Sequence, residues 1–190
     1  VINAIFAGFR NNRAEYGGAI SNSIYGVIGG IIGSFVNNSA TYAGGAIYNR
    51  NKVGGITGDF ISNSAKNHGG AIYNTAIIGN IVGDFIGNSA GNNGGAIYND
   101  DGTIGNITGD FIGNSAGNVG GAIYNVSGTI GNISGDFIGN SAKYSGGAIY
   151  NAFGTIGNIT GDFINNNLLP DEGAASFGGA IYNSSSTIGN

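Results

Sequence analysis

The chain has 190 residues, of which 40 are Gly, 8% are charged, and none is Cys, Met or Trp. Its ten Tyr, ten Phe and many Ile exclude a disordered chain, because disordered segments lack aromatic and β-branched residues. The absence of Cys excludes disulfides and thiolate metal sites, and the net charge of −4 disfavours nucleic acid as a partner.

One unit of 25 or 26 residues recurs along the whole chain. Its copies align on the Phe of a Gly-Asp-Phe motif, and these residues are Phe9, Phe35, Phe60, Phe85, Phe111, Phe137 and Phe163. A GGAI motif follows in each copy, and TIGN at residues 187–190 opens an eighth copy. Helical repeats are excluded, because most copies hold five or more Gly, which cost about 1 kcal/mol each inside a helix.

The first element of each copy reads as a strand, as residues 107–111 illustrate. Ile107, Gly109 and Phe111 point to one face and Thr108 and Asp110 to the other, with the period of two that strands require. Three residues after the Phe, every copy has Asn: Asn12, Asn38, Asn63, Asn88, Asn114, Asn140 and Asn166. A buried Asn needs hydrogen-bond partners, and a stack of identical Asn supplies them, so we predict an amide ladder.

The GGAI motif gives the next element of each copy. Its Ile never varies and is predicted to point inward: Ile20, Ile47, Ile72, Ile97, Ile123, Ile149 and Ile181. The next position is Tyr in six copies but Ser21 in the first, so we predict that it points outward.

These patterns together predict an all-β fold, a parallel β-helix or β-solenoid. Each coil has about 25–26 residues and three short strands, and there are seven coils plus the start of an eighth. Each strand pairs with its counterpart about 4.8 Å along the axis, which gives a rod roughly 34 Å long. We interpret residues 1–190 as a single β-solenoid segment of a longer repeat protein, with residues 165–177 as an inserted corner loop.

The paired motifs resemble the repeats of polymorphic outer membrane proteins, which are autotransporter adhesins. Phe111, Asn114 and Ala116 match F-x-x-N-x-A, and Gly120 to Ile123 match GGAI. The resemblance implies a right-handed β-helix and an extracellular or bacterial cell-surface location, anchored to the outer membrane through regions outside this segment. No run here approaches the roughly 18 apolar residues that span a bilayer, so we expect no membrane insertion by this segment.

A column of carboxylates is the candidate for metal binding. It consists of Asp59, Asp84, Asp110, Asp136 and Asp162. Carboxylates about 5 Å apart repel, and a hard cation such as Ca²⁺ would relieve that repulsion, but solvation and salt screening also suffice. We therefore expect no cofactor, with calcium as the alternative.

A stripe of aromatic rings is the first candidate for binding or association. It consists of Tyr48, Tyr73, Tyr98, Tyr124, Tyr150 and Tyr182. Stacked rings stabilise a fold by about 0.5–1.5 kcal/mol per pair, and the same stripe would suit glycans, host surface proteins or lateral association of rods. A second stripe of one Ile per coil would strengthen lateral packing if it is exposed: Ile61, Ile86, Ile112, Ile138 and Ile164.

The inserted corner loop is the second candidate for binding. Its distinctive residues are Leu168, Leu169, Asp171 and Glu172. Insertions in solenoids collect on one face and often bind partners, although a tolerated loop without a role is the alternative. The single His of the chain, His68, has no partner implied by spacing and is read as a surface-loop residue.

Three classes of function follow. The first is a non-catalytic cell-surface protein, an adhesin passenger or stalk that presents a binding face. The second is a filament that self-associates end to end or laterally, because five basic and two acidic residues lie in 1–70, and one basic and eight acidic in 71–190. The third, a carbohydrate-active β-helix enzyme, is disfavoured because its carboxylates should interrupt the columns, whereas here most of them follow the repeat.

Overall fold

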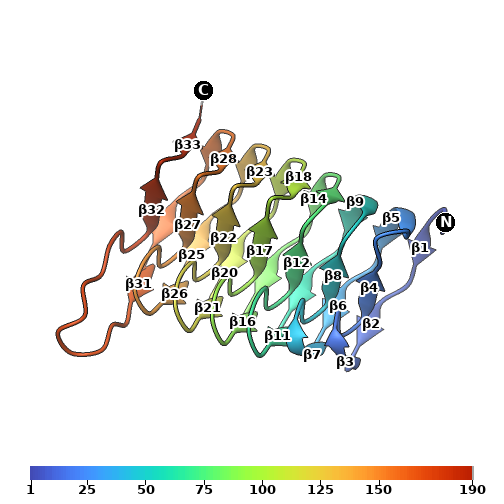
Figure 1. The fold of residues 1–190 in the computed structure, drawn as a ribbon, viewed down its shortest axis with the longest axis horizontal. Helices are drawn as coiled ribbons and strands as arrows, with labels where there is room; N and C mark the ends of the chain where they lie inside the picture. The colour runs from blue at the N-terminus through green and yellow to red at the C-terminus, as the bar shows by residue number, and fades with distance from the viewer. Residues whose placement is uncertain (190) are drawn as a thin grey trace.

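The computed structural model describes residues 1–189 and shows a rod of stacked coils, with the N-terminus at one end and the C-terminus at the other (Figure 1). The strands pair in parallel with their counterparts in the next coil, and apart from a register shift between Ala14 and Tyr16 the pairing is in register, so that Phe111 lies between Phe85 and Phe137. Three sheets have seven strands each, which makes about six turns from the first strand to the last. The parallel β-solenoid predicted from the repeat is confirmed. Within residues 1–189 there is no helix that could cross a membrane.

Four sheets, here called A to D, run along the rod. Sheet A contains β1 (Ile5–Phe6), β5 (Val27–Ile32), β9 (Lys52–Thr57), β13 (Ile77–Ile78), β14 (Ile81–Val82), β18 (Thr103–Ile104), β19 (Ile107–Thr108), β23 (Thr129–Ile130), β24 (Ile133–Ser134), β28 (Thr155–Ile156), β29 (Ile159–Thr160) and β33 (Thr187–Ile188). Sheet B contains β2 (Phe9–Arg10), β6 (Phe35–Val36), β10 (Phe60–Ile61), β15 (Phe85–Ile86), β20 (Phe111–Ile112), β25 (Phe137–Ile138) and β30 (Phe163–Ile164).

Sheets C and D complete each coil before the chain returns to sheet A. Sheet C contains β3 (Arg13–Tyr16), β7 (Ser39–Ala43), β11 (Ser64–Ala65), β16 (Ser89–Ala90), β21 (Ser115–Ala116), β26 (Ser141–Ala142) and β31 (Asn167–Leu168). Sheet D contains β4 (Ile20–Asn22), β8 (Ile47–Asn49), β12 (Ile72–Asn74), β17 (Ile97–Asp100), β22 (Ile123–Val126), β27 (Ile149–Ala152) and β32 (Ile181–Ser184).

The number of strands in each coil differs from the number predicted from the sequence. Three strands per coil were expected, with one strand over residues 107–111, but the chain turns a corner inside that range and enters sheet B at Phe111. The corner lies at Gly109, whose φ of 143° is a conformation that favours glycine. A Cβ at Gly109 would also lie 2.2 Å from the carbonyl oxygen of Gly83, so the coils can stack this closely only with Gly here.

The core is a set of columns, each made of one residue type. In the middle coils the Phe of sheet B and the Ile of sheet D are completely buried. Successive Phe rings stack with centroids 4.7–4.8 Å apart and planes within 6°. A further core column, which the sequence analysis did not identify, comes from sheet A: Ile28, Val53, Ile78, Ile104, Ile130 and Ile156.

The Asn column that follows the Phe is a buried amide ladder. Asn88 illustrates the pattern: its Nδ2 donates to Oδ1 of Asn114 at 3.0 Å and to the carbonyl of Phe60 at 2.8 Å. The backbone N–H of Asn88 also donates to Oδ1 of Asn114, at 3.0 Å. Each amide thus fixes both the neighbouring side chain and the neighbouring backbone, which removes the penalty for burying it.

A second amide ladder, which was not predicted from the sequence, runs along sheet D. Its members are the Asn residues that follow the Tyr column: Asn22, Asn49, Asn74, Asn99, Asn125, Asn151 and Asn183. From Asn22 to Asn151, each Nδ2 donates to Oδ1 of the next Asn at 2.8 Å. The last member, Asn183, is exposed and donates to the carbonyl of Ser186. Invariance of this Asn in all seven copies was the available signal.

The first and last coils are less buried than the middle ones. Phe9, Phe163, Ile20 and Ile181 are half-buried, whereas their counterparts between them are inaccessible to solvent. Within residues 1–189 each of these coils contacts a neighbour on one side only, so the columns close around the core from the second coil to the sixth.

Candidate functional site

The outer face of sheet D presents a ladder of Tyr side chains. In β17, Ile97 and Asn99 point into the core and Tyr98 between them points outward, and the same alternation of burial occurs in β8, β12, β22 and β27. Successive rings from Tyr48 to Tyr182 stack with centroids 4.7–5.0 Å apart and interplanar angles of 7–22°. Register in sheet D therefore turns one Tyr per coil into a continuous aromatic surface.

The Tyr rings are half-buried rather than fully exposed. One reason is a neighbouring column of bridge residues, formed just before GGAI by Ala43, His68, Asn93, Val119, Ser145 and Phe177. Burial raises the pKa of Tyr98, and the neighbouring Tyr124 and Asp100 raise it further. The hydroxyl groups in the middle of the ladder are therefore uncharged near neutral pH and present polar tips on an apolar wall.

The ladder ends at the first coil in a hollow. Ser21 pairs in register with Tyr48, so a small hydroxyl side chain stands where the other coils have a ring. Tyr16, from sheet C, packs against Tyr48 at 5.0 Å with a tilt of 58°. The hollow has a volume of about 320 Å³ and is lined by Tyr16, Ser21, Ser23, Tyr48 and Arg50.

The prediction that His68 is a surface-loop residue is wrong, because His68 is half-buried and forms parallel bridges with Ala43 and Asn93. Its imidazole is half-buried, with the ring centroid 4.8 Å from that of Tyr98. Nδ1 of His68 is buried and has no hydrogen-bond partner among the described residues. Burial lowers the pKa of His68, while Asp100 opposes that shift, and the Tyr73 hydroxyl donates to Asp100 at 3.4 Å.

The Asp column has a structural use in this fold. From Asp59 to Asp136, one carboxylate oxygen of each Asp accepts a hydrogen bond from the backbone N–H of the Asp in the following coil, as Asp84 does from Asp110 at 2.8 Å. The same contact joins Asp110 to Asp136 and Asp136 to Asp162, each at 2.8 Å. Across residues 1–189 no group of three or more His, Cys, Asp and Glu side chains is placed to hold a metal ion. Cation binding by the Asp column stays a prediction.

The outward Ile of sheet B forms the second stripe considered from the sequence. Ile61, Ile86, Ile112 and Ile138 are half-buried, and Ile164 is exposed. Val36 continues the stripe in the second coil, and Arg10 replaces the aliphatic residue in the first. The stripe is therefore partly open to solvent along several coils.

The inserted loop projects from the last coil beyond β31 (Figure 1). Nζ of Lys143 pairs with the Asp171 carboxylate at 2.6 Å, and the Tyr144 hydroxyl lies 3.5 Å from the same carboxylate. Leu169 is 67% exposed, Leu168 is half-buried and Glu172 is exposed. The loop does not reach the Tyr ladder except through Phe177, whose ring centroid lies 6.1 Å from that of Tyr182.

The fold and its columns define a class of protein: a tandem-repeat β-solenoid whose outward features are stripes one residue wide. The family of the Chlamydia polymorphic membrane protein (Chlamydia_PMP) repeat matches it five times, at residues 33–50, 58–75, 84–100, 109–126 and 134–152. The chain therefore carries five repeats of this kind between residues 33 and 152, and the match together with the β-solenoid fold supports its assignment as a bacterial surface repeat protein. No match was found among curated proteins or among solved structures.

Proposed function

We propose that this chain is a non-catalytic segment of a bacterial surface adhesin and that the Tyr ladder is its binding face. The repeat family supports a surface location, and the coil geometry supports a rod that carries the face away from the cell. The observation on which the proposal depends is the ladder itself, six half-exposed rings from Tyr48 to Tyr182 in continuous contact.

The chemistry of this face suits glycans better than it suits a hydrophobic partner. Each Tyr presents a ring edge and a hydroxyl group, so one surface offers both apolar contact and hydrogen bonds. Contiguous exposed aromatic surfaces on soluble proteins mark interaction sites. Ser21 shows that the first coil forms sheet D without a ring at this position, which leaves the ring available for a role other than folding.

The test is the binding of the fluorescently labelled chain to an array of immobilised neutral and acidic oligosaccharides. The variant Tyr98→Ser/Tyr124→Ser removes two central rings and introduces the residue that the first coil already has at this position. We expect at least a tenfold loss of binding, equivalent to about 1.4 kcal/mol. The matched control, Ile86→Ser/Ile112→Ser, changes two outward residues of sheet B in neighbouring coils and should bind like the unchanged chain.

If the Ile control loses as much binding as the Tyr variant, the Tyr ladder is not the binding face. If the unchanged chain binds no oligosaccharide on the array, glycans are not its ligand, and host surface proteins become the partner to test against the same two variants.

A second function, lateral packing of rods into a filament, is favoured by one observation. The Ile stripe of sheet B is half-exposed and continuous from Ile61 to Ile164, and solvated apolar stripes of this kind promote association. Sedimentation velocity over a range of concentrations would detect it. Concentration-dependent association that Ile86→Ser/Ile112→Ser abolishes would support the filament, and a single monomeric species at high concentration would count against it.

A further inference from the structure

The hollow at the first coil is built by one substitution in an otherwise regular ladder. Ser21 and Asn22 pair in register with Tyr48 and Asn49, so the backbone continues unchanged while one ring is missing. The neighbouring ring of Tyr48 stacks on Tyr73 on one side, at 5.0 Å and 16°. On the side of the first coil, the described ring nearest to Tyr48 is tilted by 58° and does not cover it in parallel.

Three kinds of side chain meet around this hollow. Tyr16 and Tyr48 form aromatic walls, Ser21 and Ser23 contribute exposed hydroxyl groups, and Arg50 contributes a guanidinium. The position of Arg50 is fixed by its backbone, which donates to the carbonyl of Asn22 at 2.9 Å. Within residues 1–189 the Arg50 side chain forms no ion pair, so its five donors remain available.

The surrounding charge favours an anionic ligand at this end of the rod. Residues 1–70 contain five basic and two acidic side chains, whereas residues 71–190 contain one basic and eight acidic side chains. The nearest acidic residue in the sequence, Glu15, is not among the residues that line the hollow. A field of this sign concentrates anions near the first coils.

We propose that this hollow is a subsite for an acidic sugar, a pyranose ring that carries a carboxylate. The C–H face of the pyranose packs against the aromatic wall that Tyr16 and Tyr48 form, its hydroxyl groups exchange hydrogen bonds with Ser21 and Ser23, and its carboxylate pairs with Arg50. Arg is suited to this because its planar fork binds a carboxylate through two parallel hydrogen bonds. The volume of about 320 Å³ lies at the lower end of the range for small-molecule sites, which fits one sugar unit. This subsite deepens the proposed glycan-binding function and rests on it.

The direct test is an NMR titration of the intact chain with methyl β-D-glucuronide, methyl β-D-glucoside and acetate. For a ligand of this size we expect a Kd on the order of 1 mM for the glucuronide. The neutral glucoside, which lacks the carboxylate, should bind at least tenfold more weakly, and acetate, which lacks the ring, should bind more weakly still. Shifts should concentrate on Tyr16, Ser21 and Tyr48.

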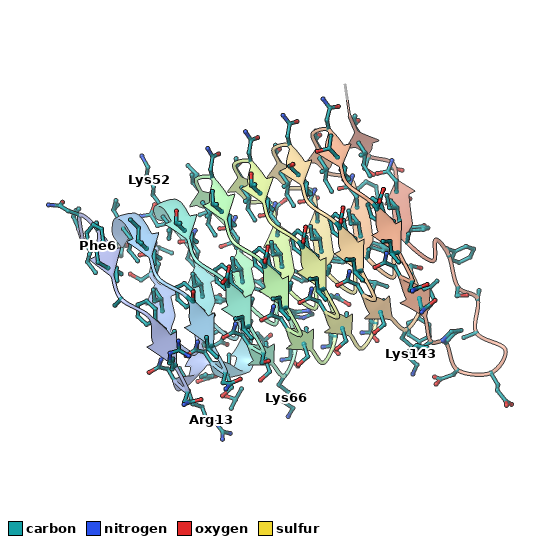
Figure 2. The ribbon with its side chains drawn as sticks, turned by 180° about the vertical axis from the view of Figure 1, so that it is seen from behind. Phe6, Arg13, Lys52, Lys66 and Lys143 are labelled. Atoms are coloured by element: carbon teal, nitrogen blue, oxygen red, sulfur yellow. The ribbon has the colours of Figure 1, made fainter. Side chains whose placement is uncertain are left out.

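Two variants and one control separate this subsite from general charge effects. Arg50→Gln should weaken glucuronide binding at least tenfold and leave glucoside binding unchanged. Lys52→Gln makes the same change in net charge two residues away, in sheet A, and should have no effect. Figure 2 shows Lys52 at the edge of the rod opposite to Arg13 and Lys66.

The variant Ser21→Tyr fills the hollow with the residue that the other coils have, so it should fold and lose glucuronide binding. Retention of binding by Ser21→Tyr, or equal losses in Arg50→Gln and Lys52→Gln, would overturn the subsite. Ser21→Tyr extends the Tyr ladder, so glucuronide binding that it retains, combined with oligosaccharide binding that is lost in Tyr98→Ser/Tyr124→Ser, would disprove the subsite alone. Glucuronide binding that Ser21→Tyr abolishes, combined with oligosaccharide binding by Tyr98→Ser/Tyr124→Ser equal to that of the unchanged chain, would instead disprove the proposed function and leave the subsite intact.

Discussion

Two ladders of sheet D lie on adjacent positions of the same strands and differ in what they contribute. The Asn ladder is buried, and each amide joins the next through a hydrogen bond of 2.8 Å. The Tyr ladder, one residue before it, is half-exposed and is held by ring stacking. The first coil keeps the Asn at position 22 but replaces the Tyr by Ser21. The inward column therefore recurs in every coil, whereas the fold does not require an outward ring in every coil.

Substitutions in the core columns should reduce the free energy of unfolding more than substitutions in either ladder. Phe111 is completely buried and stacks on Phe85 and Phe137, so Phe111→Ala removes two stacked contacts and leaves a cavity. We expect a loss of about 3–5 kcal/mol in the free energy of unfolding, measured by urea denaturation. A loss below about 1 kcal/mol would show that the Phe column does not form the core.

Substitutions in the buried Asn ladder that follows the Phe column should have the next largest effect on the free energy of unfolding. Asn114→Leu removes the Oδ1 that accepts from the backbone and side chain of Asn88, and the donor to the Phe85 carbonyl. With these groups unpaired, we expect a loss of about 2–4 kcal/mol by the same measurement. Asn106→Ala is the matched control, because its Oδ1 accepts one exposed backbone hydrogen bond from Asn132, and its effect should be below about 1 kcal/mol.

Substitutions in the Tyr ladder should reduce the free energy of unfolding less than substitutions in the Phe column or the buried Asn ladder. Tyr98→Ser removes stacking on Tyr73 and Tyr124, whose centroids lie at 4.9 and 4.7 Å. The expected loss in unfolding free energy is about 1–2 kcal/mol, since each aromatic pair contributes about 0.5–1.5 kcal/mol. A loss as large as that of Asn114→Leu would erase the distinction between the inward and outward ladders.

The smallest effect should come from His68, which packs against the Tyr ladder. Burial lowers its pKa in the folded chain, so the unfolded chain binds the proton more tightly. Stability should therefore fall as the pH decreases below about 6.5, the ordinary pKa of His, and stay constant above it as far as this group is concerned. The measurement is Tm at pH 7.5 and pH 5.0 for the unchanged chain and for His68→Asn. A fall in Tm that is equal in both would show that His68 is not responsible.

Much of the fold could be predicted because each coil has the same residues at the same inward and outward positions. Ile107 and Phe111 are inward in every copy, and their periodicity gave the buried face and the parallel stacking. The corner at Gly109 could not be read from that pattern, because an inward Gly between two inward residues looks like a continuous strand. The division into four sheets depends on such corners and so required the structure.

The candidate site was only partly visible in the sequence. The outward direction of Tyr98 follows from the alternation around it, but its half-burial depends on the bridge column, from which His68 of the preceding coil packs against the Tyr98 ring. The position of His68 beside Tyr98 has the same origin, since the two residues belong to different coils. The hollow beside Ser21 also needed the structure, because Tyr16 and Arg50 approach it from a different sheet and a different coil.

The most direct test of the separation between the two ladders measures binding and stability on the same variant. For Tyr98→Ser/Tyr124→Ser, we predict at least a tenfold loss of oligosaccharide binding while circular dichroism and urea denaturation still report a folded β-solenoid. Oligosaccharide binding that persists at the level of the unchanged chain, or falls only in proportion to the unfolded fraction, would contradict the claim that the Tyr ladder is the binding face.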